Sequence, residues 1–190
     1  MFCSGIRYAF TATAVAATVA ALAQTAAAQA KPASTGFGSG YTDIGPTVGF
    51  GNVGQASAAY GARFERAFKP LPDYDGLLGI QASIDYYSYS TPFGGTRWNY
   101  KYMPVGVTVN YHFNVDYPPL DLFLGAGVGY AARSCGVTGT SAADDCGYSS
   151  GVNGIGRVGG RFFFTSRVSA YVDASTSGAA VNTGLMLKLR

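Results

Sequence analysis

The feature that most constrains this chain is a period of two in its apolar residues. Between Trp98 and Phe113, one face carries Met103, Val105, Val107, Val109, Tyr111 and Phe113, and the other carries Tyr102, Pro104, Gly106, Thr108, Asn110 and His112. Residues that alternate in this way point to opposite sides of a β-strand, whereas a helix requires a spacing near 3.6. The segment therefore predicts a long strand with one apolar and one polar face.

The same alternation recurs often enough to predict eight strands. The other clear strands are expected at Gly76–Tyr87, Asp121–Ala131, Gly154–Phe164, Val168–Ser175 and Val181–Arg190, and two weaker ones at Thr42–Gly51 and Ala58–Phe68. Most are near the ~10 residues that a tilted strand needs to cross a bilayer. Pro46 and Pro104 fall inside strands, where the missing N–H predicts a bulge.

The first thirty residues are predicted to be a cleaved signal peptide and no part of the fold. Arg7 precedes an uncharged stretch of apolar and small residues, and Ala28-Gln29-Ala30 is a small-residue cleavage site. The alternative is a retained transmembrane helix, for which the Ala-rich stretch is only weakly hydrophobic. Residues 31–40 are expected to be a flexible Gly/Ser/Pro-rich lead-in, and residues 41–190 a single barrel domain.

The composition favours a membrane barrel over a soluble one. Charged residues make up only 12% of the chain and aromatic residues 14%. The polar faces are rich in Gly, Ser, Thr and Asn, which suits a crowded interior, whereas a soluble lipocalin-like barrel has its apolar face inside. Aromatic residues near strand ends are expected to form membrane-interface girdles, namely Tyr86, Tyr87, Tyr89, Trp98 and Tyr100 at one end and Tyr111, Phe113, Tyr117 and Phe123 at the other. The net charge of +3 forms no basic cluster, which argues against nucleic-acid binding.

Three stretches carry a resemblance to a known family. They are 103–113 (Met-Pro-Val-Gly-Val-Thr-Val-Asn-Tyr-His-Phe), 122–130 (Leu-Phe-Leu-Gly-Ala-Gly-Val-Gly-Tyr) and the final strand. With them the chain resembles the small outer-membrane β-barrels that include the OmpA transmembrane domain and OmpX-like proteins. The resemblance implies a closed eight-stranded antiparallel transmembrane β-barrel in the cell outer membrane. It also implies contact with outer-membrane lipid and with the barrel-assembly machinery.

The C-terminal end resembles that family's assembly signal. Asn182, Gly184, Leu187 and Leu189 match its polar, glycine and apolar positions. Leu189 stands where an aromatic residue is usual, and Arg190 follows it.

The polar faces also carry charges that are predicted to meet inside the barrel. These residues are Arg63, Glu65, Asp85, Arg157, Arg161, Asp173 and Lys188. The interior of an eight-stranded barrel is just wide enough for side chains to fill it, and buried charges must pair. We therefore expect an internal salt-bridge network. The alternative is a gate whose ion pairs rearrange to pass small ions.

Cysteine and histidine placement predicts a disulfide and no catalytic site. Cys135 and Cys146 lie in one Gly/Ser/Thr/Asp-rich segment, where an exported chain forms a disulfide more readily than a metal site, because neither a C-x-x-C spacing nor a nearby histidine is present. His112, the only histidine, ends the fourth strand and is expected to face a turn. It is thus too far from the outer rim for a Ser/His/acid set, and no enzyme activity, metal or cofactor is predicted.

Three functions remain open at this point. The first is a structural or surface-interaction (adhesion) barrel that contacts a partner through the loop 132–152. The second is a narrow channel for small or apolar solutes, and the third is a secreted lipocalin-like binder. Since eight strands return the chain to its starting side, both termini are expected in the periplasm. The loops near 52–57, 88–97, 132–152 and 176–180 are expected to face outward.

Overall fold

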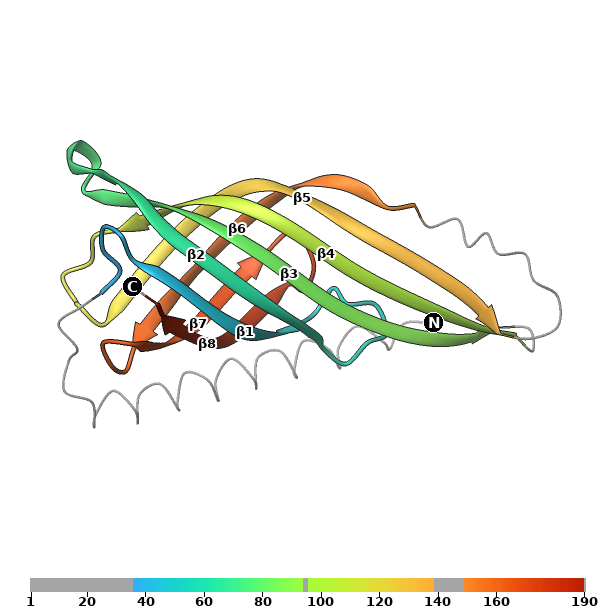
Figure 1. The fold of residues 1–190 in the computed structure, drawn as a ribbon. Helices are drawn as coiled ribbons and strands as arrows, with labels where there is room; N and C mark the ends of the chain where they lie inside the picture. The colour runs from blue at the N-terminus through green and yellow to red at the C-terminus, as the bar shows by residue number, and fades with distance from the viewer. Residues whose placement is uncertain (1–35, 94–95, 139–148, 190) are drawn as a thin grey trace, which may run out of the picture.

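The computed structural model describes residues 36–93, 96–138 and 149–189, and these residues form one closed antiparallel barrel (Figure 1). The strands are β1 (Thr42–Phe50), β2 (Ala59–Leu71), β3 (Gly76–Phe93), β4 (Thr96–Phe113), β5 (Leu120–Thr138), β6 (Gly151–Phe163), β7 (Val168–Ser175) and β8 (Val181–Lys188), with one short 3-10 turn, η1 (Pro72–Tyr74). Each strand pairs with its neighbours in chain order, and β1 closes the ring against β8. The predicted fold of eight strands is confirmed. The predicted signal peptide, residues 1–30, lies outside the described residues.

The alternation read from the sequence sets which side chains face the interior. On β4, Thr108 and Asn110 are buried at 1% and 0% exposure, whereas Val107 and Val109 are exposed at 45% and 46%. The polar interior and apolar exterior are the arrangement of a transmembrane barrel and the inverse of a lipocalin-like one. No helix in the described ranges is long and apolar enough to span a membrane.

Glycines allow the closing seam of the barrel to form. A Cβ built on Gly45 of β1 would overlap the carbonyl oxygen of Leu185, and one built on Gly184 of β8 would overlap that of Pro46. The two strands therefore approach each other at positions where any larger residue would push them apart. This agrees with the interpretation of the polar-face glycines as residues of a crowded interior.

The bulges predicted at the two strand prolines are wrong. The register of β1 against β2 runs unbroken through Pro46, and that of β4 against β5 runs unbroken through Pro104. Instead, the paired positions skip Pro46 on the β8 side and Pro104 on the β3 side. Each proline thus removes a donor from one ladder without shifting the register. The register shift on β2 lies between Ala67 and Lys69.

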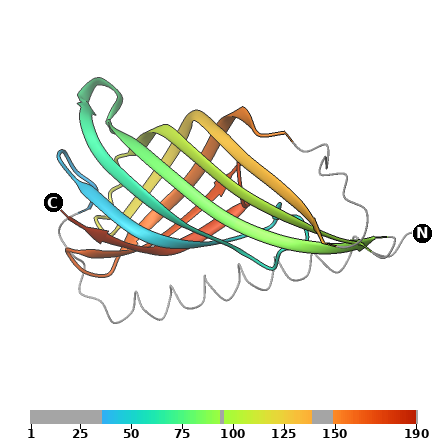
Figure 2. The ribbon, with the colours of Figure 1, turned by 45° about the vertical axis from the view of Figure 1, so that its right-hand side comes forward.

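Three strands extend well past the ring. β3, β4 and β5 have 18, 18 and 19 residues, whereas β1, β7 and β8 have 9, 8 and 8. Beyond the ring, β3 and β4 stay paired from Tyr87↔Tyr102 to Phe93↔Thr96, and β4 and β5 as far as Arg97↔Thr138. We call residues 87–93, 96–102 and 132–138 the wing. Figures 1 and 2 show it projecting from the barrel end opposite the start of β1.

Two predicted loops are partly wrong, because many of their residues belong to the strands of the wing. The predicted loop 88–97 is strand except for residues 94–95, which lie outside the described residues, and the first seven residues of the predicted loop 132–152 belong to β5. We call the barrel end that carries the wing the wing end. The other end, where β1 begins and β8 ends, is the terminal end.

The predicted aromatic girdles are only partly correct. Tyr86, Tyr111, Phe113 and Tyr117 are exposed or half-exposed on the outside, as expected. Phe123, in contrast, is buried in the interior at 1% exposure. Tyr87, Tyr89, Tyr100 and Tyr102 stack on one another along the wing, with ring centroids 4.8 Å apart for Tyr87–Tyr102, 6.0 Å for Tyr89–Tyr102 and 5.0 Å for Tyr89–Tyr100. Their position in the strands places these four rings on the side that faces the lumen lower down the barrel.

Candidate functional site: the charged interior of the barrel

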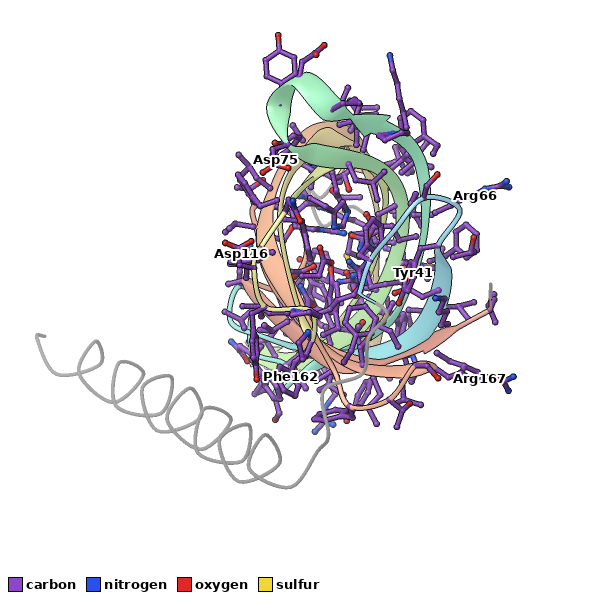
Figure 3. The ribbon with its side chains drawn as sticks, turned by 90° about the vertical axis from the view of Figure 1, so that its left-hand side faces the viewer. Tyr41, Arg66, Asp75, Asp116, Phe162 and Arg167 are labelled. Atoms are coloured by element: carbon purple, nitrogen blue, oxygen red, sulfur yellow. The ribbon has the colours of Figure 1, made fainter. Side chains whose placement is uncertain are left out.

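The interior holds one network of charged and amide side chains and one tyrosine hydroxyl. Every strand contributes to it, with Asp43 from β1, Arg63 and Glu65 from β2, Gln81 and Asp85 from β3, Asn110 and His112 from β4, Asp121 from β5, Arg157 and Arg161 from β6, Tyr171 and Asp173 from β7, and Asn182 from β8. All are at most 4% exposed. Figure 3 looks into the terminal end and shows side chains filling the ring, while Arg66 and Arg167 point away from it.

Arg161 is the centre of the network near the terminal end. Its guanidinium contacts three carboxylates, Asp43 through Nε at 3.0 Å, Asp121 through Nη1 at 2.8 Å, and Glu65 through Nη2. It also lies 5.4 Å from the centroid of the Phe123 ring. A side chain at 1% exposure with three charged partners is held by the fold and is not free to move to solvent.

A second group of ion pairs lies nearer the wing end. Arg63 binds Asp85 with two hydrogen bonds, of 2.8 Å and 3.1 Å, and its Nε lies 3.8 Å from Asp173. Arg157 approaches the same Asp173 carboxylate at 3.3 Å, and Asn182 donates to it at 2.7 Å. The bidentate Arg63–Asp85 pair fixes the side-chain geometry as well as the charge.

Gln81 joins the two groups. Its Nε2 donates to Glu65 at 3.0 Å, and its Oε1 accepts from Arg157. Asn110 adds a further donor to Glu65 at 2.7 Å. The result is a continuous hydrogen-bonded network along the interior.

The predicted charge network is largely assembled, with one exception and several additions. Arg63, Glu65, Asp85, Arg157, Arg161 and Asp173 all form ion pairs within it. Lys188 does not. It lies half-buried at the rim with its amine 5.2 Å from the centroid of the Tyr41 ring, where water can still reach it. The predicted network lacked Asp43, Gln81, Asn110, Asp121 and Tyr171, and Asn182 and His112 were predicted to have other roles. Asp121 and Gln81 lie on the polar faces, so the period of two alone would have included them.

The prediction for His112 is also wrong. The residue does not face a turn but is buried at 2% exposure, with Nδ1 2.8 Å from Asp121 and Nε2 2.9 Å from Glu65. Its ring belongs to the network because residue 112 has the same parity as Asn110. Carboxylates only accept hydrogen bonds, so this placement fits an imidazolium that donates from both nitrogens. Such a cation would help three arginines balance five interior carboxylates.

The described part of the lead-in packs into the terminal mouth. Residues 31–40 were predicted to be flexible, yet Phe37 stacks on His112 with ring centroids 3.7 Å apart and lies 5.1 Å from the Arg161 guanidinium. Tyr41 donates to Asp43 at 3.0 Å. A hollow of about 920 Å³ lies around this mouth, and another of about 350 Å³ lies at the wing end beside Tyr87 and Arg133. The charge network lies between these two ends.

The assembly-signal residues have positions that the structure describes. Asn182 is fully buried in the network, whereas Leu187 and Leu189 are exposed on the outside at 49% and 57%. Gly184 lies at the closing seam. Their role in recognition by the assembly machinery remains a prediction.

Cys135 is disulfide-bonded. Cys146 lies outside the described residues, so the Cys135–Cys146 pairing stays a prediction. Mass spectrometry of the non-reduced protein should find the two cysteines in one linked peptide pair that separates on reduction. Two free thiols in protein taken from the envelope would contradict it.

Comparison with known proteins gives only distant likenesses. No protein-family model matches the chain, and no curated protein does. Among solved structures, the N-terminal β-barrel domain of Pseudomonas aeruginosa OprF is 14% identical over 80% of this chain and 100% of its own, with a TM-score of 0.44. Ail, the attachment invasion locus protein of Yersinia pestis, crystallised with the heparin analogue sucrose octasulfate, is 13% identical over 80% and 96%, with a TM-score of 0.42. The outer membrane enzyme PagL is 21% identical over 78% and 99%, with a TM-score of 0.41. Likenesses of this size assign no activity or partner to the chain.

Proposed function

We propose that the chain is a non-conducting outer-membrane barrel that presents the wing to partners at the cell surface. One observation carries the proposal. The interior is filled by a bonded charge network, while three strands continue past the ring into a paired sheet. The longest strands continue outside the ring, and side chains fill the ring itself. This arrangement suits contact and anchoring better than conduction.

The interior argues against the channel. Conduction would require Arg161 and Arg63 to leave buried carboxylates, and breaking such pairs is costly. Phe37 in addition covers His112 at the terminal mouth.

The interior also favours a role without catalysis. Both ring nitrogens of His112 are engaged by Glu65 and Asp121, and the residue lies at the end opposite the wing. No three His, Cys, Asp or Glu residues of the described part of the chain are arranged to hold a metal ion.

The wing has the properties of a contact surface. Stacked cross-strand tyrosines stiffen it, so a partner would find it already ordered. Beyond Tyr86, β3 has no described pairing with β2, and beyond Ala131, β5 has none with β6. Among the described residues, neither edge of the wing pairs with a neighbouring strand, and Ser150 Oγ bonds the backbone N–H and carbonyl of Arg133 at the β5 edge.

The orientation of the barrel can be tested by labelling. In a Cys135→Ser/Cys146→Ser background, Thr138→Cys on the wing should react with a membrane-impermeant maleimide on intact cells. Asp73→Cys, in the exposed turn at the terminal end, should react only after the outer membrane is permeabilised. The reverse pattern would contradict the proposed orientation.

Function is tested by trimming the wing. Residues 88–101 would be replaced with Asn-Gly, which joins the cross-strand partners Tyr87 and Tyr102 through a two-residue turn. Cells carrying the trimmed barrel should lose binding to other cell surfaces by roughly tenfold or more, while Asp73→Ser at the terminal end has no effect. Heat-modifiable gel mobility would confirm that both variants fold. Unchanged binding would rule out the wing as the contact element, and steady conductance of the purified protein in planar bilayers would contradict the closed interior.

A further inference from the structure

The two faces of the wing differ in chemistry. Tyr87, Tyr89, Tyr100 and Tyr102 stack on the face that continues the lumen side. The opposite face is polar, because Ser90 donates to Asn99 at 2.6 Å and Asn99 donates to Thr138 at 3.0 Å across three strands. By the same alternation this outer face also carries Ser88, Arg97, Lys101 and Ser134. A hollow of about 540 Å³ on the wing is lined by residues that include Ser88, Asn99 and Lys101.

The outer face of the wing is continuous with the lipid-facing belt. Met103 and Val105 on β4 are exposed at 44% and 36%, and Lys101 and Arg97 follow on the same side of the same strand. At ~3.4 Å per residue, Lys101 lies about 7 Å and Arg97 about 20 Å beyond Met103 along the strand. A tilt of about 45° reduces these heights to roughly 5 Å and 14 Å. The headgroup layer is about 5–8 Å deep, so the backbone of Lys101 falls within it and that of Arg97 lies about 6–9 Å beyond it.

The charge of the wing has one sign. Arg97, Lys101 and Arg133 are exposed, and residues 87–93, 96–102 and 132–138 contain no aspartate or glutamate. Among the described residues, neither Arg97 nor Lys101 has a carboxylate within ion-pair distance. Two cations among hydroxyl and amide groups match a phosphorylated sugar, since ammonium and guanidinium groups bind phosphate and the neutral groups bind sugar hydroxyls.

We propose that the outer face of the wing binds the phosphorylated saccharide headgroups of the glycolipid in the surrounding outer leaflet. This inference rests on the proposed outer-membrane position with the wing outward. It assigns the two faces of the wing to different tasks. The outer face holds the wing against the headgroup layer, and contact with a protein partner falls to the rest of the wing.

The test compares two charge losses on opposite faces. Binding of fluorescently labelled lipooligosaccharide to the folded protein in mixed micelles would be followed by anisotropy. Lys101→Gln should weaken binding about fivefold and Arg97→Gln/Lys101→Gln about 25-fold, at the ~1 kcal/mol expected for each basic residue at an anionic membrane surface. Arg133→Gln removes the same charge beside Tyr87 and should change binding less than twofold. Chemically dephosphorylated lipooligosaccharide should bind the wild type about 25-fold more weakly.

Two results would overturn the assignment. If Arg133→Gln weakens binding as much as Lys101→Gln, then binding depends only on the overall charge of the wing, and the outer face is not a specific headgroup site. If dephosphorylation has no effect, phosphate is not recognised. Heat-modifiable mobility would confirm folding of every variant. Maleimide labelling at Thr138→Cys tests the orientation separately, so a failed orientation and a failed headgroup site give different results.

Discussion

Arg161→Met should lower the free energy of unfolding by about 3–5 kcal/mol, the cost of removing one partner from a buried ion pair. The substitution keeps most of the side-chain length but leaves Asp43, Glu65 and Asp121 facing one another without the guanidinium between them. Urea titration of the protein folded in lipid vesicles measures the change, provided that unfolding is reversible. Arg167→Met, at an exposed turn position that points away from the barrel (Figure 3), is the matched control and should stay within about 0.5 kcal/mol of the wild type.

A second substitution separates lost pairing from lost packing. If the cost of Arg161→Met comes from uncompensated negative charge, then Glu65→Gln in the same molecule should restore part of the stability. Glu65→Gln alone should destabilise the barrel, because it weakens the contacts with both Arg161 and His112. A double-mutant cycle would give the coupling between residues 161 and 65. Additive effects would mean that the charge network contributes little beyond filling space.

The ring of the barrel could be predicted from local sequence, and the reason is the strict alternation. Val107 and Thr108 are neighbours in the chain but face lipid and lumen, and a period of two is enough to assign both. The same rule correctly placed Arg63 and Asp173 inside the barrel.

The length of the wing could not be predicted in this way. From Ser88 to Pro92 both faces carry polar or aromatic residues, and Thr91-Pro92 reads as a turn. What makes the segment a strand is pairing with β4, which depends on residues that follow it and on their register. The same reason applies to the outer half of β5. Ser134 and Gly136 favour turns, so the sequence predicts a loop where pairing with β4 forms a strand.

The network inside the barrel could be predicted only in part, unlike the ring, which could be predicted, and the length of the wing, which could not. Its members could be found by parity, but their partners could not, because Arg161 meets Asp43 across 118 positions of sequence. His112 shows the difference. Parity with Asn110 places its ring on the lumen side, but only the packed interior shows that the ring lies between Glu65 and Asp121.

Val107→Arg is expected to cost about 2–4 kcal/mol, the penalty for an arginine near the midplane of a bilayer. Val107 is the middle residue of the exposed apolar row that runs from Met103 to Tyr111 on β4, and its cross-strand partners are Ala82 and Val128. Reversible folding into vesicles of defined lipid measures the cost. Met103→Arg, on the same face but at the edge of the row, should cost only about 0–1 kcal/mol, because an arginine there can reach the interface. The two variants differ only in the depth of the new arginine in the bilayer, because they share the strand, the face and the introduced side chain. Equal effects at the two positions would mean that the exposed apolar face of the barrel does not lie in hydrocarbon.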